Sequence, residues 1–196
     1  MNSQPAAEPS PATSDTAPVP SLGSPSGLHL NCGYGTDRGL RREMNEDSFI
    51  ASDPVFAVAD GMGGHEAGDL ASAAVVAAFR PLVGEREVLP EQVVAAVAQA
   101  QAAVERISAG RARGAGSTLT GIVLVNESTN PAWLVLNVGD SRVYRLSVGD
   151  LGRITHDHSL VQEMLDAGTL APADAADYVG RNVITRAIGA ADAERP

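Results

Sequence analysis

The pattern of apolar positions predicts two strands followed by two helices in the first half of the chain. Residues 48–51 and 55–59 are short apolar runs separated by Asp53-Pro54, a dipeptide typical of a turn. Residues 66–79 and 90–109 are rich in alanine and valine with helical spacing. We therefore expect a hairpin and then a helical pair.

The second half reads mainly as strands with short turns. In chain order the expected elements are a strand at 119–125, a turn at Asn130-Pro131, strands at 132–138 and 142–146, a short strand ending near Ile154, and a helix at 160–167. Closely spaced strands pair as antiparallel hairpins, and the helices then lie outside them. The sequence predicts an α+β fold of antiparallel sheets flanked by helices.

The first 27 residues differ in composition from the rest. They hold six of the twelve prolines and almost no large apolar residues, so they cannot bury enough surface to offset the entropy of ordering. We expect a disordered tail over residues 1–27 and a folded domain over residues 28–196.

Composition excludes several classes of protein. The net charge of −10 disfavours nucleic acids and anionic membranes as partners. All 14 basic residues other than histidine are arginines, which excludes chemistry that needs a lysine. Residues 1–8 lack a signal peptide, and the apolar run at 70–79 is too short to span a bilayer. We expect a cytoplasmic protein.

The segment Asp60-Gly61-Met62-Gly63-Gly64-His65 carries the first candidate site. An apolar strand delivers the Asp60 carboxylate to its end, and three glycines then allow the backbone to bend and a ligand to approach. Carboxylate and carbonyl oxygens suit Mg²⁺ or Mn²⁺. The competing interpretation is a tight turn with a capping aspartate.

Three further segments each have a structural interpretation and a chemical one. Residues 42–48 hold adjacent carboxylates beside an arginine and could be a solvated turn. Gly139-Asp140 suits a hairpin between two strands. His156-Asp157-His158-Ser159 could bind zinc, but the spacing favours Ser159 as a helix cap.

The motifs of several phosphatase and protease classes fit this sequence poorly. Cys32 and Arg38 have the spacing of cysteine phosphatases, but no helix-forming sequence follows, and a small residue in a first strand is the better interpretation of Cys32. His65 lacks the second histidine of a zinc protease helix because Asp69 stands there. Met62 occupies the place of the acid in aspartyl-phosphate phosphatases.

Taken together, the segments resemble the bacterial type 2C, metal-dependent serine/threonine protein phosphatases. The resemblance covers about residues 33–189. It rests on six segments in family order: Arg42 with Glu46-Asp47-Ser48, Asp60 to Gly68, Gly116-Ser117-Thr118, Gly139 to Tyr144, Thr155 to Ser159, and Asn182 to Gly189.

The resemblance implies a fold, a cofactor and a set of roles. The fold is an αββα sandwich of two antiparallel sheets. Asp60 bridges two Mn²⁺ or Mg²⁺ ions, the Gly61 carbonyl completes one coordination sphere, and Glu46 and Asp47 act through metal-bound waters. Asp140 belongs to a third, weaker metal site, and Arg42 binds the substrate phosphate. An activated water attacks phosphorus without a covalent phosphoenzyme.

The resemblance also implies partners and shows two departures. The substrates would be phosphorylated proteins, opposing a Ser/Thr kinase, and the protein a monomer with residues 159–177 in a mobile flap. Met62 leaves no residue for the general acid. The family's last Ser-Asp-Gly and Asp-Asn segments are absent before Pro196, so the sandwich is expected to be incomplete at the C-terminus and the chain truncated. The alternative is an inactive remnant or binding module.

Overall fold

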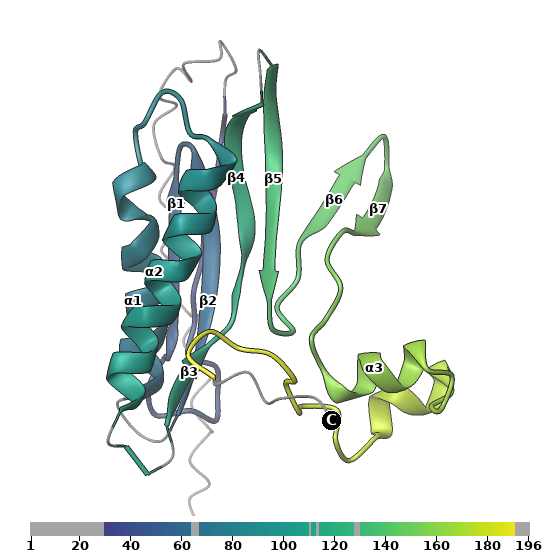
Figure 1. Ribbon diagram of the computed structural model, residues 1–196. Coiled ribbons are helices and arrows are strands. Elements are labelled where there is room, and N and C mark those ends of the chain that lie inside the picture. Colours follow the sequence, from purple (N-terminus) through teal and green to yellow (C-terminus); the bar gives the residue numbers. More distant parts are fainter. Residues whose placement is uncertain (1–29, 64–66, 110, 113, 128–129, 191–196) are drawn as a thin grey trace, which may run out of the picture.

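The structure is a computed structural model, and the residues it describes are 30–63, 67–109, 111–112, 114–127 and 130–190. The predicted tail at residues 1–27 lies outside the described residues, as does His65. Figure 1 shows a layer of two long helices against one sheet, a smaller hairpin beyond it, and a short helix at the base.

The larger sheet is antiparallel, with the order β1-β2-β4-β5, and β3 also pairs with β2. Its strands are β1 (Asp47–Ser52), β2 (Val55–Gly63), β3 (Ala115–Ser117), β4 (Leu119–Glu127) and β5 (Asn130–Val138). A second sheet consists of the hairpin β6 (Tyr144–Ser147) and β7 (Asp150–Arg153). Its two-residue loop has positive φ at Val148 and Gly149, as such tight hairpins require.

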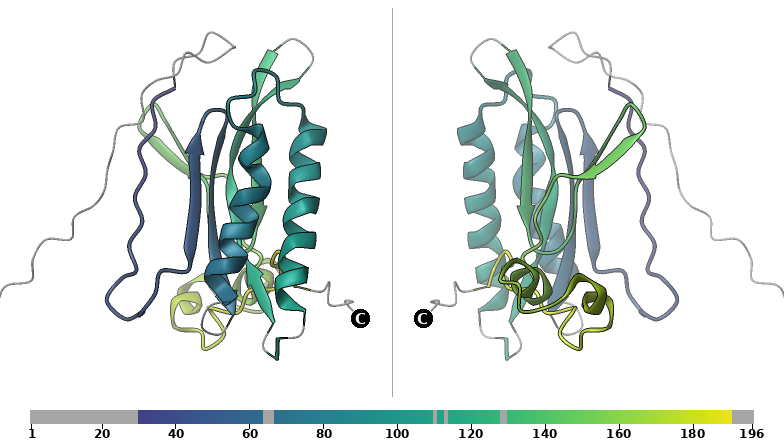
Figure 2. Two further views of the ribbon diagram at one scale, coloured as in Figure 1. Left: turned by 90° about the vertical axis from the view of Figure 1, so that its left-hand side faces the viewer. Right: turned by 90° about the vertical axis from the view of Figure 1, so that its right-hand side faces the viewer.

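Helices α1 and α2 cover one face of the larger sheet (Figures 1 and 2). The helical elements are α1 (Ala67–Phe79), the 3-10 helix η1 (Arg80–Leu82), α2 (Pro90–Ser108), α3 (Leu160–Asp166) and the 3-10 helix η2 (Pro172–Asp177). Pro90 occupies the first turn of α2, and the Leu89 N–H donates to the Gln92 side chain. No helix among the described residues is long and apolar enough to cross a membrane.

The core lies between these helices and the sheet. Val55, Ala57 and Ala59 alternate along β2 and are buried toward α1 and α2, where Val75 and Val104 are fully buried. Because side chains of a strand alternate between faces, Val58 and Asp60 project from the opposite face and are exposed. The buried face fixes the register of β2, and with it the position of Asp60.

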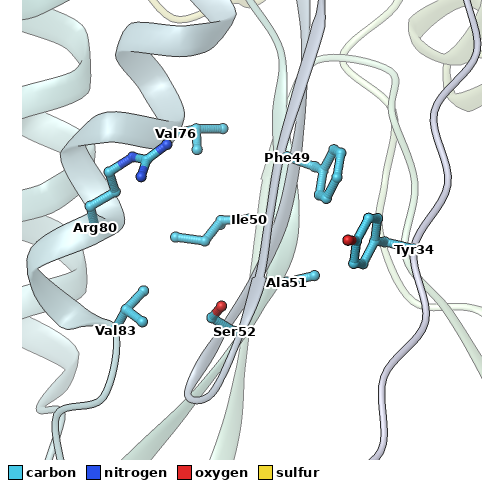
Figure 3. Close-up of a pocket in the computed structure, with 8 residues that line it drawn as sticks. All are labelled: Tyr34, Phe49, Ile50, Ala51, Ser52, Val76, Arg80 and Val83. Atoms are coloured by element: carbon cyan, nitrogen blue, oxygen red, sulfur yellow. The ribbon is translucent and has the colours of Figure 1, made fainter. Parts of the chain in front are cut away.

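The same alternation holds on β1, at the edge of the sheet. Figure 3 shows Ile50 on the side of α1, whereas Phe49 faces Tyr34 across the other side of the strand. The rings of Tyr34 and Phe49 stack at 4.7 Å between centroids. A pocket of about 420 Å³ adjoins this edge, and Arg80 is its only charged lining residue among the described ones.

The predicted α+β class, with antiparallel sheets flanked by helices, is confirmed, but several boundaries were wrong. Strand β2 continues through Asp60 to Gly63, because Gly61–Gly63 pair with β3. Asn130-Pro131 belongs to β5, and Pro131 is tolerated there because β5 is an edge strand. Cys32 lies in an extended segment outside any strand, with its thiol 3.8 Å from the Ala51 carbonyl oxygen.

The expected hairpin at Gly139-Asp140 is also wrong. The strands on either side, β5 and β6, belong to different sheets. Gly139 has a φ of +107°, and the chain leaves the larger sheet at this residue. The segment from Gly139 to Val143 therefore crosses between sheets instead of closing a hairpin.

Candidate metal and phosphate site

Two aspartates face each other on neighbouring strands. Asp47 on β1 is the cross-strand partner of Asp60 on β2. Side chains of directly opposed residues in an antiparallel pair lie on the same face of the sheet. This face is the one turned away from α1 and α2, so both carboxylates stand on its open side.

Glu46 lies where β1, β2 and α1 meet. Its carbonyl oxygen accepts hydrogen bonds from the Gly61 N–H at 3.1 Å and the Ser72 hydroxyl at 2.6 Å. A Cβ atom on Gly61 would lie 1.9 Å from the Gly68 carbonyl oxygen, and one on Gly68 would lie 2.7 Å from Glu46 Oε1. Glycine is required at position 61, where the near atoms are backbone, and not by a positive φ; at position 68 the nearest atoms belong to the flexible Glu46 side chain, which can move aside.

Arg42 precedes this strand pair. Its guanidinium donates to Glu46 Oε2 at 3.2 Å, and 74% of its side chain is exposed. One contact leaves most of the five guanidinium donors available. Arg42 can therefore bind an anion beside the carboxylates.

Asp140 is carried by the crossing segment and not by a strand. On one side of it, Gly139 exchanges two hydrogen bonds with His158: the Gly139 N–H donates to His158 Nδ1 at 3.1 Å, and the His158 N–H donates to the Gly139 carbonyl at 2.9 Å. On the other side, the Ser141 hydroxyl lies 3.0 Å from the Thr118 hydroxyl. These polar contacts fix the backbone around Asp140.

An ion pair next to this segment could not be inferred from sequence. Asp157, only 4% exposed, accepts hydrogen bonds from Arg142 Nε at 2.9 and 3.0 Å and lies 3.3 Å from Arg153 Nη1. The hydrogen bonds to Asp157 raise the pKa of Arg142. The only signals in the sequence are the separate Ser141-Arg142 and Thr155-His156-Asp157 segments, which carry no hint of pairing.

The zinc interpretation of residues 156–159 is not supported by the contacts. His156 pairs with Asp166, Asp157 with Arg142, and His158 with the Gly139 backbone. Ser159 caps α3, since its hydroxyl accepts the Gln162 N–H at 3.3 Å, and this confirms the predicted cap.

The electrostatic environment of Asp60 connects the predicted residues. Partial desolvation raises the pKa of the Asp60 carboxyl, the charges of Asp47, Asp140 and Glu46 raise it further, and Arg42 opposes them. The fold thus brings together the five charged residues predicted for the site. Gly61, the sixth, directly follows Asp60 in β2.

A pocket of about 330 Å³ opens beside these residues. Asp47 and Asp60 line it together with Ser141 and residues 35–37. Unlike the pocket at the β1 edge, it contains two of the predicted metal ligands, Asp47 and Asp60, so a metal ion or a phosphate could enter it beside them. Asp140 lines a separate pocket of about 410 Å³.

The donor set fits a hard divalent cation, with one limit. Carboxylate and carbonyl oxygens are the ligands of Mg²⁺ and Mn²⁺, and a cation would relieve the charge repulsion at Asp60. Over the described part of the chain, however, no three His, Cys, Asp or Glu side chains are grouped closely enough to hold an ion on their own. These residues can supply part of a coordination sphere, with water completing it.

Comparison with known proteins identifies the family. Residues 38–164 match the family model described as protein phosphatase 2C. The chain is 36% identical over 165 residues to the serine/threonine protein phosphatase PstP of Mycobacterium tuberculosis, covering 82% of this chain and 31% of that protein. It is 34% identical to the serine/threonine phosphatase Stp of Listeria welshimeri, covering 82% and 67% of the two chains.

Solved structures agree with the sequence matches. The crystal structure of M. tuberculosis PstP superimposes with a TM-score of 0.69 at 35% identity, covering 78% of this chain and 65% of that one. The PstP catalytic domain in complex with two manganese ions gives a TM-score of 0.68 at 36% identity, covering 78% and 64%. The chain thus spans about a third of the mycobacterial protein and just under two thirds of its solved domain. It belongs to the protein phosphatase 2C family.

Proposed function

We propose that the protein is a Mn²⁺- or Mg²⁺-dependent phosphatase that hydrolyses phosphoserine and phosphothreonine in other proteins. One observation carries the proposal: Asp60 lines a pocket with Asp47, and its carboxyl feels the charges of Asp47, Asp140, Glu46 and Arg42, within a family whose named members are serine/threonine phosphatases. A cation would relieve the repulsion between these carboxylates, and an arginine beside them suits a phosphate.

Each residue has a distinct part in this proposal. Asp60 and the Gly61 carbonyl would hold the metal ions directly, Glu46 and Asp47 through water, and Asp140 a further ion. When bound, the ions supply Lewis-acid activation of a water molecule and neutralise phosphoryl charge. Arg42 binds the phosphoryl oxygens and orients the phosphate, since its guanidinium matches their geometry. Met62 cannot donate a proton, so no general acid is assigned.

The same proposal covers the substrates, the oligomeric state and the cellular location. The substrates are proteins phosphorylated by a Ser/Thr kinase, and the protein acts as a monomer in the cytoplasm. The net charge of −10 supports a protein partner over nucleic acid. Residues 1–27 remain a predicted disordered tail.

Phosphate release from a phosphothreonine peptide by the complete gene product tests the proposal. Activity should require Mn²⁺ and be abolished by EDTA, and Asp60→Asn should lower it about 100-fold or more, as expected when a group that stabilises the transition state is lost. Glu85→Gln, at an exposed position between η1 and α2, should leave it unchanged. Absence of EDTA-sensitive release by the unaltered protein would contradict the proposal.

A second candidate is a phosphoprotein-binding module without catalysis. The Arg42–Glu46 ion pair favours it, because it gives that carboxylate a partner other than a metal. Calorimetric titration with Mn²⁺ separates the two functions. Two sites of micromolar affinity would argue for the phosphatase, whereas phosphopeptide binding without metal binding would argue for the module.

A further inference from the structure

Thr118 lies at a break in the sheet, opposite Asp60. Strand β2 pairs with β3 at Gly61–Gly63 and with β4 at Val55–Val58, and Thr118 is the single residue between β3 and β4. Both ladders share one register, in which Thr118 would be the partner of Asp60. It is fully buried.

The Thr118 side chain replaces a backbone hydrogen bond of this ladder. The Thr118 N–H donates to the Asp60 carbonyl at 2.8 Å, as in a regular antiparallel pair. The return bond differs: the Asp60 N–H donates to Thr118 Oγ1 at 2.9 Å instead of to the Thr118 carbonyl. That carbonyl accepts the Ser117 hydroxyl at 2.8 Å.

The same side chain also contacts the segment that carries Asp140. Thr118 Oγ1 lies 3.0 Å from Ser141 Oγ, and a hydroxyl can accept from Asp60 while bonding to Ser141. The methyl group lies against Gly139, where an added Cβ would be 2.6 Å from Thr118 Cγ2. One buried side chain therefore touches the residues on both sides of Asp140 and the backbone of Asp60.

We propose that Thr118 is a positioning residue that sets the relative placement of the Asp60 and Asp140 carboxylates. Its hydroxyl links the Asp60 N–H to the Ser141 hydroxyl, and its methyl group lies against Gly139. The effect on metal binding rests on the proposed function, whereas the contacts of Thr118 with Asp60, Gly139 and Ser141 do not.

Two substitutions separate the hydroxyl from the methyl group, and a third serves as a control. Thr118→Val removes the hydroxyl at nearly constant volume, and Thr118→Ser keeps it. Thr120→Val is the matched control, because Thr120 on β4 is also buried. Among the described residues, its hydroxyl bonds only to the Leu136 carbonyl, at 3.3 Å.

Amide hydrogen exchange by NMR on the full chain is the primary measurement. In Thr118→Val we expect exchange at Asp60, Asp140 and Ser141 to increase at least about tenfold more than in Thr120→Val, as for loss of a hydrogen bond of ordinary strength. Thr118→Ser should retain protection at Asp60. Equal changes in the two valine variants, or changes spread evenly over the sheet, would reduce Thr118 to a structural role and overturn the proposal.

Paramagnetic broadening by Mn²⁺ extends the test to the metal. Thr118→Val should need several-fold more Mn²⁺ than Thr120→Val to broaden the signals of Asp60 and Asp140, with Thr118→Ser in between. If Thr118→Val alters amide exchange but needs no more Mn²⁺ than Thr120→Val to broaden these signals, Thr118 has no effect on metal placement. If the unaltered chain shows no broadening, the proposed function fails while the exchange result still decides the role of Thr118.

Discussion

The carboxylates of the site are supported in two different ways. Glu46, Asp47 and Asp60, the strand half of the site, lie on or beside β1 and β2, whose opposite face packs on α1 and α2. Asp140 belongs to the turn half, residues 139–142, which leaves the sheet and is held by the polar contacts of Thr118, Asp157 and His158.

This difference determines how each half should respond to change. Apolar packing tolerates changes in pH and salt but not in volume, since interiors are close-packed. Ion pairs and hydrogen bonds tolerate modest changes in volume but depend on charge. The strand half should therefore fail by steric conflict and the turn half by loss of charge or of a hydrogen-bond partner.

Gly61→Ala should have the largest effect. The added methyl group would lie 1.9 Å from the Gly68 carbonyl and 2.7 Å from the Glu46 carbonyl, both backbone atoms that cannot move aside cheaply. We expect the free energy of unfolding to fall by about 3 kcal/mol or more, measured by urea denaturation. Gly152→Ala in β7 is the control, because nothing lies within 4 Å of its added carbon. Equal stability of the two variants would show that the strand half is loosely packed.

Asp157→Asn should have the next largest effect, and on the turn half. The change keeps the shape of a buried side chain but leaves Arg142 and Arg153 without their carboxylate. Because Arg142 is 45% exposed, we expect the free energy of unfolding to fall by about 2 kcal/mol, which is less than the loss when a fully buried ion pair is broken.

The location of the Asp157→Asn effect is as informative as its size. NMR shift changes should concentrate at residues 139–142 and spare β1 and β2. Asp166→Asn, which removes an exposed partner of His156, should change stability less. Shift changes of equal size on β2 would mean that the two halves are one mechanical unit.

Ser72→Ala should have a smaller effect on the strand half. Ser72 is fully buried, and its hydroxyl donates to the Glu46 carbonyl at 2.6 Å and contacts the Ser48 hydroxyl at 3.0 Å. The Glu46 carbonyl keeps its bond from Gly61, so we expect a loss of about 1 kcal/mol in urea unfolding. A loss above that of Asp157→Asn would contradict the view that packing dominates this half.

The two halves also differ in how far sequence could predict them. The alternation of Val55, Ala57 and Ala59 with Asp60 is a local pattern, so the strand and its carboxylate could be predicted. The extension of β2 to Gly63 could not, because it depends on pairing with residues more than 50 positions away. Asp140 was predicted as a site residue only through a family resemblance.

The contacts that hold the turn half could not be predicted from any local sequence pattern. Arg142 pairs with Asp157 and Thr118 with Ser141 across 15 and 23 positions. Nothing in the local sequence distinguishes these residues from solvated polar ones, and the Gly139-Asp140 pair reads as a hairpin turn. Only the three-dimensional path of the chain between the two sheets brings the partners together.

His158 offers a test of the turn half by pH, with the smallest expected effect. Burial lowers the pKa of His158, Arg186 and His156 lower it further, and Asp157 and Glu163 oppose them. The neutral ring is the form that accepts the Gly139 N–H at Nδ1. The unfolded chain therefore takes up the proton at higher pH than the folded chain does.

The sign of the effect follows from this difference. The contribution of His158 to the free energy of unfolding is fully present above the pKa of about 6.5 that it has in the unfolded chain. This contribution is lost as the pH falls below that value, since the unfolded state then binds more protons. His158→Asn keeps an acceptor near the Nδ1 position but does not titrate. In urea unfolding between pH 7 and pH 5, the free energy of unfolding should fall less in this variant than in the unaltered chain. If the two halves are independent, the difference between these two losses should be the same when both chains also carry Gly61→Ala.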